Sequence, residues 1–391
     1  MNILILLSMA FVLLGLTGLI DRGGRPLRRK ARGRSPVDPS RWPGVGVIVP
    51  ATGKASILSS SIHSLLVQNY PSYEIVFVTR TLEDPASEII RRAIGEFKHA
   101  KHVISGKAEG CGQKNHNLLV GLKALGGDAE VLVFCDSTRK ATPQWLRALV
   151  RPIAIKEAAV STGYHHIIPA THDICTTGRA ITVLLLYLTQ GVSWLTQPWG
   201  GSTAITRKLF NDLRVSDIWS RNVVDDVSLA ACLRKAGIRV INTPEACLTT
   251  PLAQETLIGW QEWFIRQILY LKFCLFGSWM ALQLYWQLLT ALLVWAFIKC
   301  CTIGVGGNAS LSVLAAPLFL TAFAFMGAIL RRLHPDPGPF WIWLAAFYLN
   351  IFLISWCLLR TLFARQLYWR GILYRVDRGG IVLDAKETES L

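Results

Sequence analysis

The chain has 391 residues, of which 52% are hydrophobic, and its formal net charge is +16. This composition excludes a chain of ordinary soluble domains and indicates a membrane protein with one substantial soluble domain. Much of the positive charge lies beside apolar segments, so contact with anionic lipid is favoured over nucleic-acid binding. The nine cysteines show no CxxC pair or metal-ligand spacing, which indicates buried thiols in a reducing compartment.

The first apolar segment, Asn2–Ile20, is uncharged and long enough to cross a bilayer. A cleaved signal peptide has basic residues before its apolar core, whereas here an arginine-rich run follows it. The positive-inside rule then predicts an uncleaved anchor, with the N-terminus outside and the next domain in the cytosol. We expect a transmembrane anchor over residues 1–21 and a basic linker over residues 22–43.

Strand-like and helical patterns alternate from residue 44 to about residue 250. The predicted strands are Val45–Val49, Glu74–Val78, Val103–Ile104 and Val131–Phe134, and the predicted helices are Ile57–Gln68, Glu88–Phe97 and Gln113–Leu125. This alternation predicts an α/β domain over residues 44–252, with a mostly parallel sheet and helices on both faces.

Carboxylates follow one strand and open one helix of this domain. Asp136 ends the apolar run 131–135, and Asp225 and Asp226 open a helical pattern. Side chains at the carboxyl edge of a parallel sheet face the crevice where such sheets bind ligands. Each acid also fits a turn or a helix cap, and the pair fits the positive end of a helix dipole. Together, in a chain with lipid-spanning segments, they favour metal-assisted sugar transfer.

The C-terminal half is apolar and aromatic. Residues 253–280, and Leu257–Met280 in particular, predict an amphipathic helix in the membrane interface, with a buried core helix as the alternative. Three apolar segments, about 281–301, 308–330 and 339–365, predict transmembrane helices within residues 281–366, and residues 367–391 form a basic, aromatic tail. Four crossings would return this tail to the outside, although its arginines favour the cytosol. One apolar segment is therefore interfacial or re-entrant.

Several segments resemble ceramide glucosyltransferase, a family 21 enzyme, among the membrane-bound family 2-type inverting glycosyltransferases. They are Trp42-Pro-Gly-Val, Gln68-Asn-Tyr-Pro-Ser-Tyr-Glu74, Glu83-Asp84-Pro85-Ala86, Lys114-Asn-His-Asn-Leu118, Cys135-Asp-Ser137, Asp225-Asp226, the interfacial segment and Trp369-Arg-Gly371. The resemblance covers nearly the whole chain. It implies a GT-A catalytic domain with a nucleotide-sugar donor.

The resemblance also implies roles on the donor side. Asp84 takes the position of the acid that holds uridine, and Lys114 stands where a basic residue approaches the diphosphate. Pro50, at the end of the first strand, falls in the same nucleotide-sugar site. Without the resemblance, Asp84 equally fits a helix or turn cap and Lys114 a solvated helix face.

Asp136 resembles the metal-binding acid of the DxD-type motif, which implies Mg²⁺ or Mn²⁺ as cofactor. The run Asp136-Ser137-Thr138 lacks the second acid of that motif, as ceramide-type enzymes do. The remaining ligands are therefore open, with His165, His166 and Asp225 as possibilities.

On the acceptor side, Asp226 takes the place of the catalytic base and Asp225 that of the preceding acid. An inverting reaction needs such a base to remove the proton of the acceptor hydroxyl. Trp199-Gly200-Gly201-Ser202 resembles the acceptor-side loop.

The family's interfacial signature is Gln or Arg, two residues, then Arg-Trp. Here Arg266 keeps the arginine position, where it can compensate the diphosphate, while Trp263 and Gln267 replace the flanking residues. This departure argues against a processive polysaccharide synthase.

These implications together predict transfer of a hexose from a UDP-sugar, with UDP-glucose first among donors, to a membrane-lipid hydroxyl. Ceramide, a sterol-like lipid and diacylglycerol are open as acceptors. The alternatives are a polysaccharide synthase of the same superfamily and a non-catalytic lipid-binding scaffold. The expected partners are the donor, the lipid acceptor and the bilayer, without nucleic acid, and the oligomeric state is open.

Overall fold

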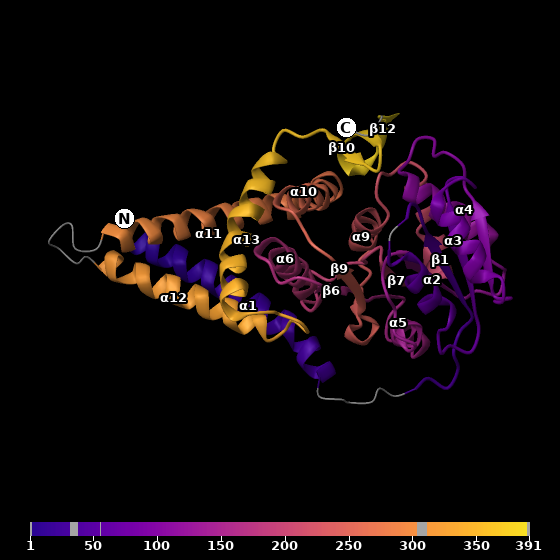
Figure 1. Cartoon of the computed structure of the whole chain (residues 1–391), viewed down its shortest axis with the longest axis horizontal. Coiled ribbons are helices and arrows are strands. Elements are labelled where there is room, and N and C mark those ends of the chain that lie inside the picture. The colour runs from indigo at the N-terminus through magenta and orange to yellow at the C-terminus, as the bar shows by residue number, and fades with distance from the viewer. Residues whose placement is uncertain (1, 32–37, 55, 303–310, 389–391) are drawn as a thin grey trace.

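The structure is a computed structural model that describes residues 2–31, 38–54, 56–302 and 311–388. An α/β domain lies at one end, and long apolar helices extend from it at the other (Figure 1). In the described residues the main sheet has seven strands in the order β3-β2-β1-β4-β7-β5-β8. Their bounds are β1 Val45–Pro50, β2 Tyr73–Thr79, β3 Ala100–Ile104, β4 Val131–Cys135, β5 Val160–Thr162, β7 Ser202–Thr206 and β8 Ile241–Asn242.

The predicted α/β class is confirmed. Strands β1 to β4 pair in parallel, as does β5 with β8, while β7 runs antiparallel to β4 and β5. Helices α2 (Leu58–Leu66), α3 (Pro85–Ile94) and α5 (Trp145–Ala154) cover one face. Helices α4 (Gln113–Ala124), α7 (Arg207–Asp212), α8 (Val215–Trp219) and α9 (Asp226–Lys235) cover the other. The strand β1 alternates Val47 and Val49 toward the first layer with Ile48 toward the second, as a strand buried on both faces must.

The N-terminal helix α1 (Asn2–Ala31) does not end at residue 21 but continues into the arginine-rich run. Asp21 pairs with Arg25 at 2.5 Å and with Arg28 at 3.1 Å, one and two turns further on. These contacts and the good helix propensity of arginine allow the helix to persist there. The part of the expected basic linker over residues 32–37 lies outside the described residues.

Two helices join the α/β domain to the long apolar helices. They are α6 (Ile174–Gln190) and α10 (Leu257–Cys274), and the apolar helices are α11 (Phe276–Thr302), α12 (Leu311–Arg331) and α13 (Phe340–Arg360). The Thr182 hydroxyl on α6 accepts hydrogen bonds from Trp260 Nε1 on α10 at 2.9 Å and Asn350 Nδ2 on α13 at 2.8 Å. Because all three side chains are buried, this polar junction fixes the three helices against one another.

Helix α10 begins where the interfacial helix was predicted and ends at Cys274, so α11 starts before residue 281. Trp260, Phe264 and Phe273 of α10 are buried inside the protein. These side chains pack on protein, whereas Leu257 and Ile258 of the same helix are exposed, so the interfacial placement stays a prediction. In the part of the chain that the structure describes, four helices, α1, α11, α12 and α13, are long and apolar enough to cross a membrane.

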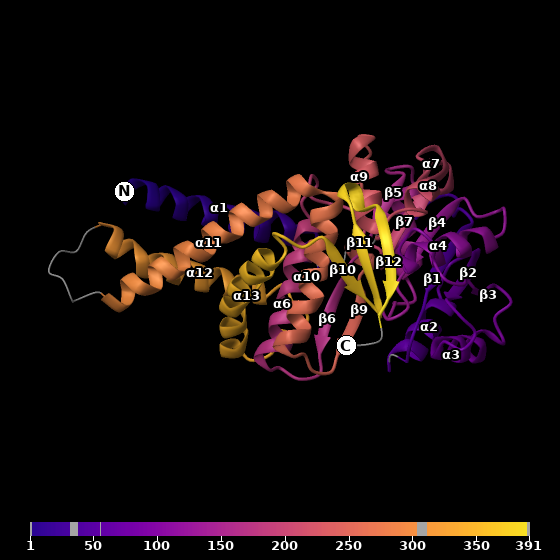
Figure 2. The ribbon, with the colours of Figure 1, turned by 90° about the horizontal axis from the view of Figure 1, so that it is seen from above.

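The tail of the chain forms a second sheet that the sequence patterns did not indicate. Its antiparallel strands are β10 (Gln366–Trp369), β11 (Ile372–Val376) and β12 (Val382–Glu387). Figure 2 shows this sheet lying between α10 and the main sheet. The tail therefore packs on protein at residues where contact with lipid headgroups was expected.

Candidate active site

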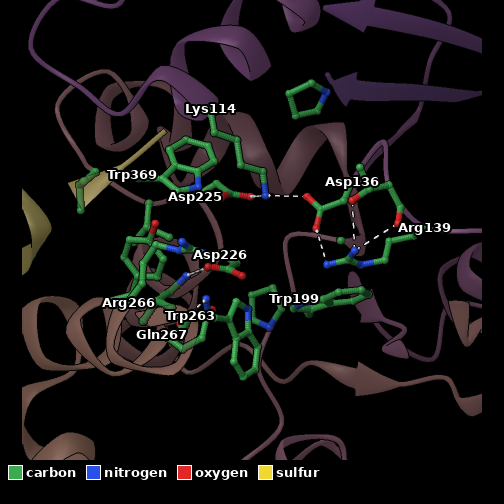
Figure 3. Close-up of a pocket in the computed structure, with 18 of the residues that line it drawn as sticks. Lys114, Asp136, Arg139, Trp199, Asp225, Asp226, Trp263, Arg266, Gln267 and Trp369 are labelled. Carbon is green, nitrogen blue, oxygen red and sulfur yellow. Dashed lines mark hydrogen bonds and ion pairs between the residues drawn. The ribbon is translucent and has the colours of Figure 1, made fainter. Parts of the chain in front are cut away.

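A cavity of about 400 Å³ opens at the carboxyl ends of β1 and β4. The loop before β7, the start of α9, helix α10 and the tip of the C-terminal hairpin complete its wall (Figure 3). The predicted residues that line the cavity are Pro50, Lys114, Asp136, Trp199, Gly201, Asp225, Asp226, Trp263 and Arg266. The fold thus brings together residues from the predicted donor, acceptor and interfacial segments.

Lys114 is the cation at the centre of this site. Its ammonium lies 3.0 Å from Asp136 Oδ1 and 3.1 Å from Asp225 Oδ2, and it reaches the Gly200 carbonyl oxygen at 3.4 Å (Figure 3). Burial alone would lower the pKa of Lys114, but Asp136, Asp225 and Asp226 raise it above its ordinary value. Burial likewise opposes ionisation of Asp136, but Lys114 and Arg139 hold its pKa below the usual range. Lys114 and Asp136 are therefore charged at neutral pH. Lys114 does not lie on a solvated helix face.

The Asp226 carboxylate has the opposite behaviour. Burial and the neighbouring Asp225 raise its pKa to about 6, although Lys114 and two backbone donors oppose the shift. Those donors are the Gly200 N–H at 3.0 Å and the Val227 N–H at 2.7 Å. A carboxylate with this pKa is ionised at neutral pH and is a stronger base than an ordinary aspartate.

The loop before β7 brings the backbone against this acid pair. A Cβ atom at Gly200 would lie 2.5 Å from Asp225 Oδ2 and 2.7 Å from Lys114 Nζ, so any larger residue would displace this ion pair. Trp199 stacks on His165 with a ring-centroid distance of 4.7 Å and forms one wall of the cavity. Ser202, by contrast, is buried and accepts a hydrogen bond from Trp145 Nε1 at 2.9 Å. Of the four predicted loop residues, Trp199 and Gly201 line the cavity, Gly200 braces Asp226, and Ser202 holds β7.

Asp84 lies outside the cavity lining and serves as the cap of α3. Its carboxylate accepts hydrogen bonds from Ala86 N at 2.9 Å, Gly53 N at 2.8 Å and the Thr52 hydroxyl at 2.6 Å. Thr52 itself lines the cavity. Asp84 therefore fixes the loop after β1.

Helix α10 contributes Trp263, Arg266 and Gln267 to the cavity, and Figure 3 shows all three on the same side as Asp226. The Arg179 guanidinium stacks over the Trp263 ring at 3.6 Å and pairs with Glu255 at 2.6 Å. Arg266 has no carboxylate within 4.0 Å among the described residues. A half-buried cation without an anionic partner leaves the site prepared for an anion.

The metal ligands suggested by the sequence do not all converge. Within the described residues, no three His, Cys, Asp or Glu side chains gather as a metal-binding group. His165 lines the cavity, but its Nδ1 lies 2.7 Å from the Thr250 hydroxyl, and burial with Arg139 keeps its pKa well below the usual value. His166 does not line the cavity and instead contacts Tyr187 and His334. Asp136 Oδ2, with Arg139 as far as 4.0 Å away, remains available to a hard cation.

Several lining residues were not predicted as site residues, among them Arg139, Trp369 and Arg370. Arg139 lies near Asp136 on the donor side, and Trp369 and Arg370 come from the tip of the C-terminal hairpin. Arg139 follows Asp136 by three residues. A basic residue so close to the acid that ends β4 could have been recognised from the sequence as a site residue. The two tail residues belonged to a segment that the family resemblance already contained, but no role was assigned to it.

Comparison with known proteins gives one family match. The model described as "Glycosyl transferase family 21" matches residues 3–382 of this chain. The sheet with helices on both faces, together with the family match, confirms the GT-A domain that the resemblance implied.

Solved structures with a similar arrangement are distant in sequence. The mannosyltransferase PcManGT from Pyrobaculum calidifontis, in complex with GDP-Man and Mn²⁺, is 16% identical, with 90% of this chain and 99% of that chain covered and a TM-score of 0.46. GalNAc-T7 with UDP, GalNAc and Mn²⁺ is 14% identical, with 60% and 48% covered and a TM-score of 0.41. Glucosyl-3-phosphoglycerate synthase from Mycobacterium tuberculosis is 17% identical, with 63% and 81% covered and a TM-score of 0.39.

Removal of the central cation should destabilise the α/β domain. Lys114→Met leaves Asp136 and Asp225 as neighbouring carboxylates without their buried partner, so we expect the free energy of unfolding to fall by about 3 kcal/mol. Thermal unfolding of the purified protein measures this change. Lys123→Met, at an exposed position of the same helix, is the matched control and should leave the melting temperature unchanged. Equal melting temperatures for both variants would contradict the central role of Lys114.

Proposed function

Because the chain belongs to glycosyl transferase family 21, we propose that it transfers a hexose from a UDP-sugar to the hydroxyl of a membrane lipid. UDP-glucose is the first candidate donor and ceramide the first candidate acceptor. The reaction proceeds with inversion, in one displacement at the anomeric carbon. The observation that carries the proposal is the convergence of an excess of cations with a raised-pKa carboxylate in one cavity that ends against apolar helices.

The charges of the cavity suit an anionic donor. Five cationic side chains line it, against three carboxylates: Arg80, Lys114, Arg139, Arg266 and Arg370, and Asp136, Asp225 and Asp226. The surplus of positive charge complements a diphosphate, and Arg266 has no competing carboxylate within 4.0 Å among the described residues. Asp84 supports the uridine end indirectly, by holding the loop that contains Thr52. Pro50 ends β1 beside this loop.

The other end of the cavity suits a lipid acceptor. Its lining includes Leu186 of α6, Ile268 and Leu271 of α10, and Leu282 of α11. Helix α11 is one of the candidate membrane spans. An acceptor with an apolar body can therefore reach the cavity from the bilayer and present a polar head to the acids.

In the proposed reaction, Asp226 removes the proton of the acceptor hydroxyl as its oxygen attacks the anomeric carbon. The C–O bond to the diphosphate breaks, and the UDP leaving group keeps that electron pair. Trp199 and Trp263 shape the acceptor side, and the backbone N–H of Gly200 orients the Asp226 carboxylate. The neighbouring Asp225, which pairs with Lys114 at 3.1 Å, raises the pKa of Asp226 and so makes it a stronger base. Arg266 compensates the charge that develops on the leaving diphosphate.

A divalent metal fits this scheme only if the donor supplies some of the metal ligands. The Asp136 carboxylate is the protein ligand that we assign to Mg²⁺ or Mn²⁺, and phosphate oxygens of the donor would supply further ligands. When bound, the metal neutralises negative charge on the diphosphate. Neither His166 nor a second acid joins Asp136 in the described part of the chain.

The position of the tail supports a proposed orientation in the membrane. Hydrogen bonds from Val223 N to the Gly380 carbonyl oxygen and from Asn222 Nδ2 to the Gly379 carbonyl oxygen tie the tail to the α/β domain, so both lie on one side. An even number of crossings must then separate α10 from the tail. We propose that α11 and α12 cross while α13 lies along the interface. In support, 56% of an apolar 18-residue stretch of α13 is buried in the protein, against 33% of the corresponding stretches of α11 and α12. Figure 1 shows α13 running across these two helices. The arginine-rich end of α1 then faces the cytosol with the catalytic domain.

Purified protein in lipid nanodiscs should convert UDP-glucose and ceramide into a β-linked hexosyl lipid and UDP. Asp226→Asn should lower kcat/KM by roughly 10²–10⁴-fold, because it removes the base with little change of volume. In the unchanged protein, kcat/KM should fall as the pH drops through about 6, where the Asp226 carboxylate gains a proton, and Asp226→Asn should lack this limb. Mass spectrometry, NMR of the anomeric proton and pH–rate profiles measure these outcomes.

Asp212→Asn on the exposed surface is the control for that substitution, and its rate should not change. A ladder of polymer products would favour the polysaccharide synthase, and lipid binding without UDP release would favour the scaffold. Loss of activity in Asp225→Asn with a mild effect of Asp226→Asn would show that the wrong carboxylate has been assigned.

Chelation should abolish transfer. EDTA would remove a metal held by Asp136, and added Mn²⁺ or Mg²⁺ should restore the rate. Asp136→Asn should lose activity that no metal restores while it retains its far-ultraviolet circular dichroism. Full activity in excess chelator would overturn the metal assignment.

Both ends of α13 should be accessible from the cytosolic side. Single cysteines at Asp336 and Phe363, in a variant whose exposed native cysteine is replaced, should react with a membrane-impermeant maleimide in inside-out vesicles. Opposite accessibility of the two positions would mean that α13 crosses the bilayer.

A further inference from the structure

The C-terminal hairpin turns through an unusual residue. Arg370 and Gly371 form its two-residue loop between the paired residues Trp369 and Ile372, and their φ angles are +49° and +76°. Loops of this kind with two positive φ values favour Asn-Gly. A left-handed backbone at arginine costs about 1–2 kcal/mol. The fold alone therefore gives no reason for arginine at this position, and such an outlier points toward function.

The loop places Arg370 against the donor end of the cavity. Its Nη1 donates a hydrogen bond to the Thr52 carbonyl oxygen at 3.2 Å. The Thr52 hydroxyl in turn donates a hydrogen bond to the Asp84 carboxylate. Trp369 and Arg370 both line the cavity, and Figure 3 shows Trp369 beside Lys114 and Asp225. Surrounding protein lowers the pKa of Arg370, while the charges of Asp136 and Asp84 oppose that change. The guanidinium thus lies within electrostatic reach of both donor-side acids.

The hairpin is held firmly enough to position this group. The Tyr374 hydroxyl accepts a hydrogen bond from Gln113 N at 3.2 Å, at the start of the helix that carries Lys114. Glu387 forms ion pairs with Arg80 and with Lys107. Contacts from β11 and β12, the two strands that follow the tip, therefore fix the tip relative to Lys114 and its acidic partners.

We propose that Arg370 binds the diphosphate of the nucleotide-sugar donor and that the C-terminal hairpin is a wall of the donor site. This inference rests on the proposed function. Among the described residues no carboxylate pairs with Arg370 within 4.0 Å, and the Thr52 carbonyl takes one of its five N–H groups. The planar fork of the remaining donors matches phosphate oxygens in a way that lysine cannot. Trp369, from the same tip, covers the cavity beside it.

The test uses substitutions that separate turn geometry from charge. Arg370→Asn gives the loop the favoured Asn-Gly sequence, so the melting temperature should stay equal or rise. The dissociation constant for UDP, measured by calorimetry on the full chain in nanodiscs, should rise by roughly 10- to 100-fold. The dissociation constant for UMP should change less, because UMP lacks the second phosphate. Arg370→Lys should restore affinity only in part.

Two further variants complete the experiment. Arg375→Ala, at an exposed position of β11, should bind UDP as the unchanged protein does. Arg266→Ala should also weaken UDP binding, because Arg266 faces the same diphosphate, and the two effects need not add in the double variant. If Arg370→Asn binds UDP with unchanged affinity, or if UMP and UDP are weakened equally, the assignment of Arg370 to the diphosphate is wrong. If the unchanged protein binds no UDP, the proposed function itself fails.

Discussion

The site depends on one buried ammonium. Lys114, from α4, contacts acids that follow β4 and begin α9, and it reaches the loop before β7. Without this cation, Asp136, Asp225 and Asp226 would repel one another in a buried space, and the elements that carry them would separate. Its charge is shared among three acids, so compensation is incomplete, and Asp226 keeps a pKa of about 6 while Asp136 stays ionised. Domain cohesion and the strength of the proposed base therefore come from the same contact.

The sequence predicted the parts of this arrangement that follow local rules. The strands β1 to β4 are apolar runs separated by helical patterns, and parallel strands end at a common edge, so Asp136 could be placed in the crevice. The acids at the start of α9 were also found as a local pattern. The antiparallel strand β7 was not predicted, because its residues Ser202–Thr206 are small and mostly polar, although all but the last are buried. Likewise, the nearly complete burial of α6 removes the apolar and polar faces that make a helix easy to recognise.

The aromatic residues of the sequence distinguished least between contact with lipid and contact with protein. The periodicity of α10 fits a helix against lipid and a helix against protein equally well, and the structure shows Trp260 and Phe264 packed on protein while Ile258 is exposed. The tail posed the same ambiguity, because tyrosine, tryptophan and arginine suit both a membrane interface and a sheet that covers a charged cavity. Its strands pair with each other locally, but the contacts that place them, such as Tyr374 with Gln113, join positions far apart in the sequence. Such contacts have no signature in a local window.

Because the tail packs back on the α/β domain, the candidate site is completed only late in synthesis. The α/β domain emerges early, and domains generally fold from the N-terminus as they leave the ribosome. The cavity wall at Trp369 and Arg370, however, is translated after all four long apolar helices. The nascent chain therefore carries an incomplete site until its membrane segments have been made. An enzyme with the proposed function would then begin to consume its donor only after its membrane segments are in place.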